Sequence, residues 1–146
     1  MFEILEATVG GIHSAFQRGT LTAQALVRMY LDRIAAHDQQ GAAINALTNL
    51  NHEALAEAQR LDAAFQTSGL TGPLHGIPVI IKDQIDVNGM PTTLGSVLFK
   101  DFFPGRDAFV VERLRRSGAI ILAKATLGEL GAGDTHKSEE HTSELQ

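Results

Sequence analysis

The chain has 146 residues, of which 44% are hydrophobic and 20% charged, a length and composition typical of one globular domain with its own core. Its formal net charge is −5 and no cluster of lysines and arginines stands out, which argues against a nucleic-acid-binding surface. The absence of cysteine excludes disulfide bonds and a thiolate zinc site.

The N-terminal residues, Met-Phe-Glu-Ile-Leu-Glu, lack the basic start that is typical of a signal peptide. No apolar stretch approaches the length that crosses a bilayer. We therefore expect a cytoplasmic protein with no membrane partner.

Three amphipathic helices are predicted in the first half of the chain. The first covers residues 8–18 and ends before Gly19, a residue type favoured just beyond a helix. The second begins after Thr22, which can cap it, and carries apolar residues at the spacing of a core-facing stripe. Asn51 is predicted to cap the third helix, which ends before Gly69.

The second half of the chain predicts a strand, a helix and a second strand. The β-branched run at 79–82 favours a buried strand. Asp107 is predicted to cap a helix that ends at Gly118, and residues 119–123 form a second apolar run. This order predicts a parallel pair within an α/β sheet. Residues 43–50 fit either a short strand or an extended link.

Lys82 is a lone cation at the end of the first apolar strand. A charged amine is costly to bury, and burial lowers the pKa of a lysine until the neutral amine can accept a proton. The position therefore indicates a general base, although a lysine at a strand end can also extend its amine to water. Lys124 ends a similar run, and we expect it to have a structural partner. Asp83 is not expected to contact Lys82, because adjacent strand residues point to opposite faces.

Other polar residues are interpreted as structural. Ser96 follows a glycine in a polar loop and is expected to fix a turn rather than act as a nucleophile. Glu129 is expected to pack or to hydrogen-bond locally, with Lys82 or Lys124 as a candidate partner. His75 is expected to belong to a turn or to support its neighbours rather than to bind a ligand. No cofactor is predicted, and no metal site is predicted from the acidic and histidine residues that cluster near the C-terminus: Asp134, His136, Glu139 and His141.

Several motifs, in order, resemble the amidase signature family over most of the chain. The segment Gly72-Pro-Leu-His-Gly-Ile-Pro-Val-Ile-Ile-Lys-Asp83 is similar to the family pattern Pro-Leu-x-Gly-Ile-Pro-x-x-x-Lys-Asp. Ala123-Lys-Ala-Thr-Leu-Gly-Glu129 resembles Gly-Lys-Thr-Asn-x-x-Glu, and Thr92-Thr-Leu-Gly-Ser96 also fits the family.

This resemblance implies a mixed sheet covered by helices and hydrolysis of a small-molecule carboxylic amide to an acid plus ammonia or an amine. It also implies that Lys82 is the base of a Ser–Ser–Lys triad. The Gly-Gly-Ser-Ser-Gly-Gly motif that would carry both serines is absent from this sequence. We therefore expect an N-terminal fragment of an amidase, inactive as it stands, with unpaired strands and uncovered apolar faces.

The domain boundaries follow from composition. Residues 1–136 are predicted to be the N-terminal part of an amidase domain. Residues 137–146 contain three glutamates, one lysine and a single aliphatic side chain, and they resemble the translation of a sequencing-adapter oligonucleotide. We interpret them as a non-native acidic tail.

Two other functions remain open. The same motifs resemble the amidase subunit of a tRNA-dependent amidotransferase, although the segment from Thr126 to Glu129 fits a stand-alone amidase better. The chain could also be a small non-catalytic binding domain. The sequence leaves the particular amide and the oligomeric state open.

Overall fold

The structure, a computed structural model, describes residues 2–132. The predicted tail at 137–146 and the four metal-type residues near it lie outside this range. The elements, in chain order, are α1 (Val9–Gln17), α2 (Ala23–His37), β1 (Leu47–Leu50), α3 (Ala54–Ser68), β2 (Pro78–Lys82), the short 3-10 helix η1 (Val97–Phe99), α4 (Phe109–Arg116), β3 (Ile120–Ala125) and the 3-10 turn η2 (Glu129–Gly131).

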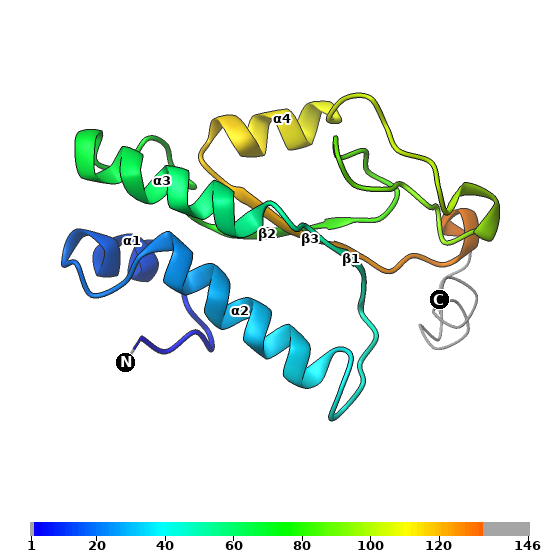
Figure 1. The fold of residues 1–146 in the computed structure, drawn as a ribbon, viewed down its shortest axis with the longest axis horizontal. Helices are drawn as coiled ribbons and strands as arrows, with labels where there is room; N and C mark the ends of the chain where they lie inside the picture. The colour runs from blue at the N-terminus through cyan, green and yellow to red at the C-terminus, as the bar shows by residue number, and fades with distance from the viewer. Residues whose placement is uncertain (1, 133–146) are drawn as a thin grey trace.

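The three strands form one mixed sheet in the order β1-β3-β2 (Figure 1). β2 and β3 run parallel, with α4 as their connection, and β1 runs antiparallel to β3. The predicted parallel pair is therefore confirmed. The segment at 43–50, which the sequence left open, contributes strand β1.

Local sequence signals explain where the first two helices begin. The Thr8 hydroxyl accepts a hydrogen bond from Gly11 N at 3.1 Å, and the Thr22 hydroxyl accepts one from Ala25 N at 3.0 Å. Each threonine thereby satisfies one of the backbone donors that a helix leaves free at its start. Asp62 of α3 accepts two more bonds from the first residues of α2, at 2.7 and 3.0 Å.

Two predicted caps are wrong. Helix α3 begins at Ala54, and the Asn51 side chain instead bonds Glu53 N at 3.0 Å and Ile121 O at 2.7 Å. Helix α4 begins at Phe109, and the Asp107 carboxylate bonds Asn88 N at 2.7 Å. The Asp107 carboxylate is thus taken by a partner far along the chain. The Asn51 oxygen bonds a backbone N–H just before the helix, and the Asn51 amide N–H donates to β3.

Helices cover both faces of the sheet. On one face, α1, α2 and α3 pack against Ile120 and Leu122 of β3. On the other face, Val111 of α4 packs with Ile81 of β2 and Ile121 of β3. This arrangement confirms the predicted α/β class, with a sheet enclosed between helical layers (Figure 1).

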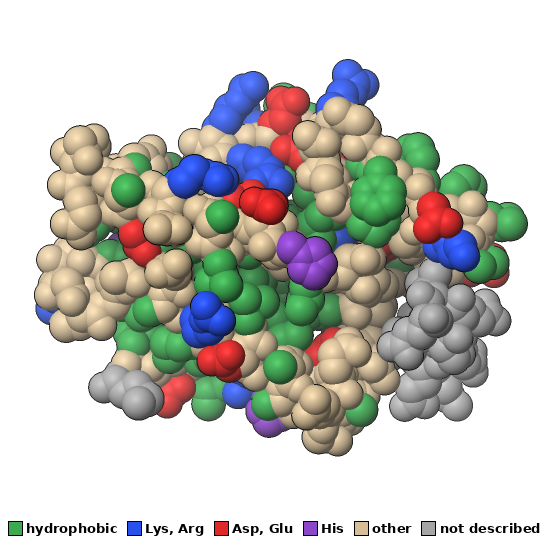
Figure 2. All heavy atoms as spheres, viewed as in Figure 1, with side chains coloured by type: hydrophobic (Ala, Val, Ile, Leu, Met, Phe, Trp, Pro, Cys, Tyr) green, Lys and Arg blue, Asp and Glu red, His purple; other side chains and the backbone are tan. Residues whose placement is uncertain are grey.

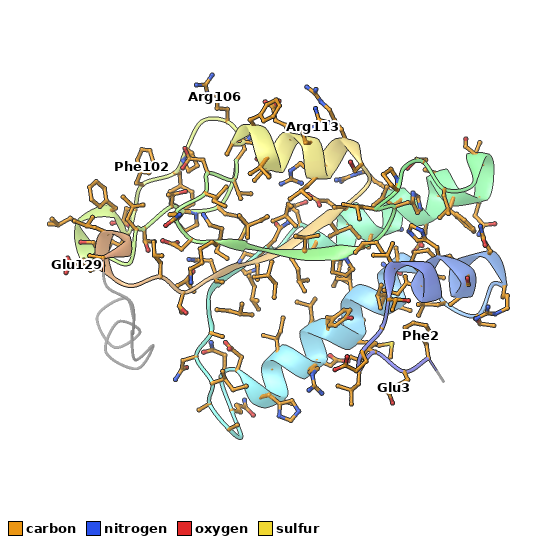
Figure 3. All side chains as sticks on the ribbon, turned by 180° about the vertical axis from the view of Figure 1, so that it is seen from behind. Phe2, Glu3, Phe102, Arg106, Arg113 and Glu129 are labelled. Atoms are coloured by element: carbon orange, nitrogen blue, oxygen red, sulfur yellow. The ribbon has the colours of Figure 1, made fainter. Side chains whose placement is uncertain are left out.

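Large apolar side chains nevertheless remain exposed in the described range, as the sequence predicted. Figure 2 shows hydrophobic side chains gathered at the end of the molecule that carries η1 and η2, and basic side chains over α4. Figure 3 places Phe102 and Glu129 at that same end. The exposed apolar residues at this end are Val97, Leu98, Phe99, Phe102 and Leu130.

Within residues 2–132, every helix is too short or too polar to cross a membrane.

Candidate active site around Lys82

The loop that leads into β2 is fixed against the turn between α4 and β3. Leu74 N donates to Ser117 O, and Gly76 N donates to Gly118 O, both at 2.9 Å. Gly118 has φ +90°, and a Cβ atom there would lie 2.7 Å from the Cα atom of His75. A glycine is therefore required for the two loops to approach this closely, and their contact sets the starting point of the strand that ends at Lys82.

Lys82 is exposed, so the expectation of a buried amine is wrong. β2 is an edge strand, and its neighbour Ile80, on the same face of the strand, is 48% exposed. No described element covers this face of β2 at the position of Lys82. The Lys82 amine donates a hydrogen bond to the backbone carbonyl of Thr126, just beyond the end of β3.

The buried lysine of this sheet is Lys124, which has no exposed surface. Its amine donates three hydrogen bonds: to Ile85 O at 2.8 Å, to Pro91 O at 3.1 Å and to the Thr92 hydroxyl at 3.2 Å. Burial lowers the pKa of Lys124 below its ordinary value, while the charges of Asp83 and Asp86 oppose that shift. The expectation of a structural partner for Lys124 is confirmed, and the partners are mainly carbonyls.

A β-bulge determines where Lys124 points. Val79 and Ile81 are two residues apart in β2, yet they pair with Ile121 and Lys124, which are three residues apart in β3. The extra residue in β3 reverses the usual alternation of faces, as bulges do. It places Lys124 on the same face as Ile121, beneath the segment that follows β2.

Asp83, the residue after Lys82, is also completely buried. Its carboxylate accepts hydrogen bonds from the Thr93 hydroxyl at 3.0 Å and from Thr93 N at 3.3 Å. Its own backbone N–H donates to Ala125 O at 3.0 Å. Asp83 thus faces Thr93 rather than the Lys82 amine, as the alternation of strand residues predicted.

Ser96 and Glu129 form a contact between two loops. The Ser96 hydroxyl donates to the Glu129 carboxylate at 3.1 Å, and Ser96 N donates to Thr93 O at 3.0 Å. Ser96 is buried, which supports its predicted role in fixing a turn. The partner of Glu129 is therefore this serine, 33 residues earlier in the chain, rather than one of the two lysines.

His75 occupies the junction between α1, α3 and the loop before β2. Its Nδ1 atom accepts a hydrogen bond from Thr71 N at 3.3 Å, and the Phe16 and Phe65 rings pack against its imidazole. Burial lowers the pKa of His75, the charge of His13 lowers it further, and Asp62 opposes the shift. The turn role predicted for His75 is confirmed.

The described residues contain no group of three or more acidic or histidine side chains positioned to hold a metal ion. The candidate site contains the exposed Lys82 amine and, on the opposite face of the sheet, the buried polar side chains of Asp83, Thr92, Thr93 and Lys124.

The sequence singled out Lys82 but did not predict the buried hydrogen bonds of Lys124 and Asp83. The available signal was the second apolar run that ends in a lysine at 124, together with the adjacent threonines at 92 and 93. Neither pattern predicts a bulge, so the direction of the Lys124 side chain was not accessible from sequence.

The fold and the site define a class of protein: an α/β chain whose mixed sheet has a lysine at the carboxyl end of a parallel strand. A family model described as Amidase matches residues 25–140, so the chain belongs to the Amidase family. The match includes residues 137–140, and the boundary proposed at residue 136 stays a prediction.

Solved structures of amidases share this fold. The native peptide amidase from Stenotrophomonas maltophilia is 40% identical with a TM-score of 0.82, over 85% of this chain and 25% of that one. An amidase family protein from Bacillus anthracis is 35% identical with a TM-score of 0.81, over 86% of this chain and 25% of that one. A bacterial aryl acylamidase of the amidase signature family, 20% identical with a TM-score of 0.75, has the same fold.

Curated relatives give a second line of similarity. A glutamyl-tRNA(Gln) amidotransferase subunit from Oleidesulfovibrio alaskensis is 40% identical over 140 residues, which are 94% of this chain and 28% of the relative. The corresponding protein of an Exiguobacterium species is 36% identical over 130 residues, 89% of this chain and 26% of the relative. The chain therefore spans about a quarter of the length of the relatives it matches.

Proposed function

We propose that this chain supplies the lysine base of a serine amidohydrolase that cleaves carboxylic amides to an acid and ammonia or an amine. The observation that carries the proposal is the position of the Lys82 amine. It lies at the carboxyl end of a parallel strand, exposed, with the Thr126 carbonyl as its hydrogen-bond partner. The motif around it resembles the lysine motif of the family to which the chain belongs.

In this proposal Lys82 accepts the proton of a serine hydroxyl. A serine hydroxyl is a weak nucleophile until a nearby base removes its proton, and a neutral lysine amine can take that proton. The family resemblance implies that a bridging serine relays the proton from the nucleophilic serine. Both serines are proposed to come from sequence beyond the segments described here.

A segment exchange tests this function. Residues 2–132 replace the matching segment of the Stenotrophomonas maltophilia peptide amidase, and ammonia release from a peptide amide is measured. We expect the chimera to be active and Lys82→Met to lower its kcat/KM by about 10²- to 10⁴-fold, the range typical of a general base. Lys100→Met, at another exposed lysine, is the matched control and should retain activity. An active Lys82→Met chimera rules out Lys82 as the base.

A second candidate is the amidase component of a glutamyl-tRNA(Gln) amidotransferase, favoured by identities of 36–40% to such proteins. Exchange of residues 2–132 into the Oleidesulfovibrio alaskensis protein distinguishes this function from that of a stand-alone amidase. Amidotransferase activity close to that host's own, together with little activity in the peptide amidase host, favours the amidotransferase component. The reverse result favours the stand-alone amidase.

A further inference from the structure

Two buried charged groups lie behind Lys82, and adjacent threonines connect them. Thr92 accepts a hydrogen bond from the Lys124 amine at 3.2 Å. Thr93 donates one to the Asp83 carboxylate at 3.0 Å. All four side chains are buried. Because a buried charge is costly without hydrogen bonds, these bonds fix the positions of the four side chains relative to one another.

Both of these charged groups are close to Lys82 along the chain or across the sheet. Asp83 directly follows Lys82, and its N–H binds Ala125 O at 3.0 Å. Lys124 lies two residues before Thr126, whose carbonyl accepts the hydrogen bond from the Lys82 amine. The backbone that carries Lys82 therefore adjoins buried Asp83. The backbone carbonyl that accepts the Lys82 hydrogen bond lies near buried Lys124.

We propose that Lys124, Thr92, Thr93 and Asp83 act together as a positioning unit that holds the Lys82 amine in place. Lys124 fixes the end of β3 and binds the segment that follows β2 through Ile85 O and Pro91 O. Asp83 fixes the end of β2. Displacing a catalytic group by about 1 Å costs on the order of 10²-fold in rate, so such a unit matters for a base.

The catalytic meaning of this unit rests on the proposed function, whereas its test does not require activity. The readout is the exchange of the lysine ammonium protons with water, followed by NMR in the 146-residue chain with ¹⁵N-labelled lysine. The chain contains four lysines, so the spectrum is simple: Lys82, Lys100, Lys124 and Lys137. Loss of the signal in a Lys82→Arg variant assigns Lys82.

In the unsubstituted chain, the Lys82 ammonium should exchange more slowly than that of exposed Lys100. Lys124→Met removes the buried amine, and Thr92→Val removes one of its acceptors. We expect each to speed exchange at Lys82 by about fivefold or more, the factor that corresponds to about 1 kcal/mol for one hydrogen bond.

Two matched variants control for general loosening. Thr92→Ser keeps the hydroxyl and should keep the slow exchange. Thr67→Val removes an exposed hydroxyl that binds Ala63 O within α3 at 3.2 Å, away from the ends of β2 and β3, and should leave Lys82 unchanged. Unchanged exchange at Lys82 in folded Lys124→Met overturns the proposal. If that variant does not fold, unchanged exchange in Thr92→Val overturns it. Failure of the amidase chimera leaves these rates unaffected, so the two proposals fail separately.

Discussion

Lys124 pairs with Ile81 in the parallel ladder between β2 and β3, and Ile81 immediately precedes Lys82. Since adjacent residues of a strand point to opposite faces, the two lysines extend to opposite sides of the sheet. One amine is completely buried and the other is exposed. Substitutions of these two residues should therefore have very different effects on stability.

Lys124→Met is expected to lower the free energy of unfolding by about 2–4 kcal/mol. The substitution leaves Ile85 O and Pro91 O without the Lys124 donor and removes the Lys124 charge that interacts with the Asp83 carboxylate. Urea unfolding followed by circular dichroism measures the change. A variant as stable as the parent chain shows that the methionine fills the site without loss.

Lys82→Met is expected to lower the free energy of unfolding by about 1 kcal/mol or less, because the exposed amine makes one hydrogen bond, to Thr126 O. It is the matched lysine control for Lys124→Met under the same urea conditions. A loss comparable to that of Lys124→Met contradicts the exposed position of this side chain.

Arg115→Gln is expected to cost about 1–2 kcal/mol, because Arg115 joins two segments through partly buried charged hydrogen bonds. It binds Glu57 of α3 at 2.6 Å and Asp107 at 2.9 Å. Arg116→Gln is the control, since Arg116 pairs with Glu112 at 3.4 Å and its side chain is 77% exposed. Thermal unfolding of both variants should give a clear loss for Arg115 only.

Gly118→Ala is expected to destabilise the chain by more than Gly19→Ala. Both glycines have positive φ, at +90° and +68°, so each substitution costs about 1–2 kcal/mol from the backbone alone. At Gly118 the new Cβ atom would also lie 2.7 Å from the His75 Cα atom, whereas at Gly19 nothing lies within 4 Å. Equal losses in urea unfolding count against the close approach of these loops.

Lowering the pH from 7 through 6.5 is expected to lower the free energy of unfolding through His75. Its pKa in the folded chain lies below the ordinary value of 6.5, so the unfolded chain takes up this proton first and gains stability. The stability that neutral His75 contributes is therefore fully present above pH 6.5. It is lost as the pH falls toward the pKa of His75 in the folded chain.

His75→Asn provides the comparison for this pH dependence. The asparagine oxygen can accept the Thr71 N–H in place of Nδ1 but does not titrate. Urea unfolding between pH 5 and 7.5 should therefore show a flatter dependence for this variant. The same slope in both chains assigns the effect to other histidines.

Sequence patterns predicted those elements whose causes are local. Thr22 begins α2 through a bond to a residue three positions along, and the apolar runs at 79–82 and 119–123 became neighbouring parallel strands. Asn51 and Asp107 carry the residue types that favour a helix start, but more distant partners compete for their side chains. Local patterns do not show such competitors.

The site was predictable only in part for the same reason. The lysine that ends β2 was identified from its position, but its burial depends on which elements cover that face of the sheet. The burial of Lys124 depends on an extra residue in the pairing of β3 with β2. The register between two strands depends on the whole sheet, so it cannot be predicted from the sequence of one strand.

Two of the three acceptors of the Lys124 amine are main-chain oxygens, those of Ile85 and Pro91. Any amino acid presents such an oxygen, so the anchor places little demand on side-chain identity at these two positions. The side chains at these two positions can therefore vary without removing an acceptor of the buried amine. This segment tolerates sequence changes that the lysine itself does not.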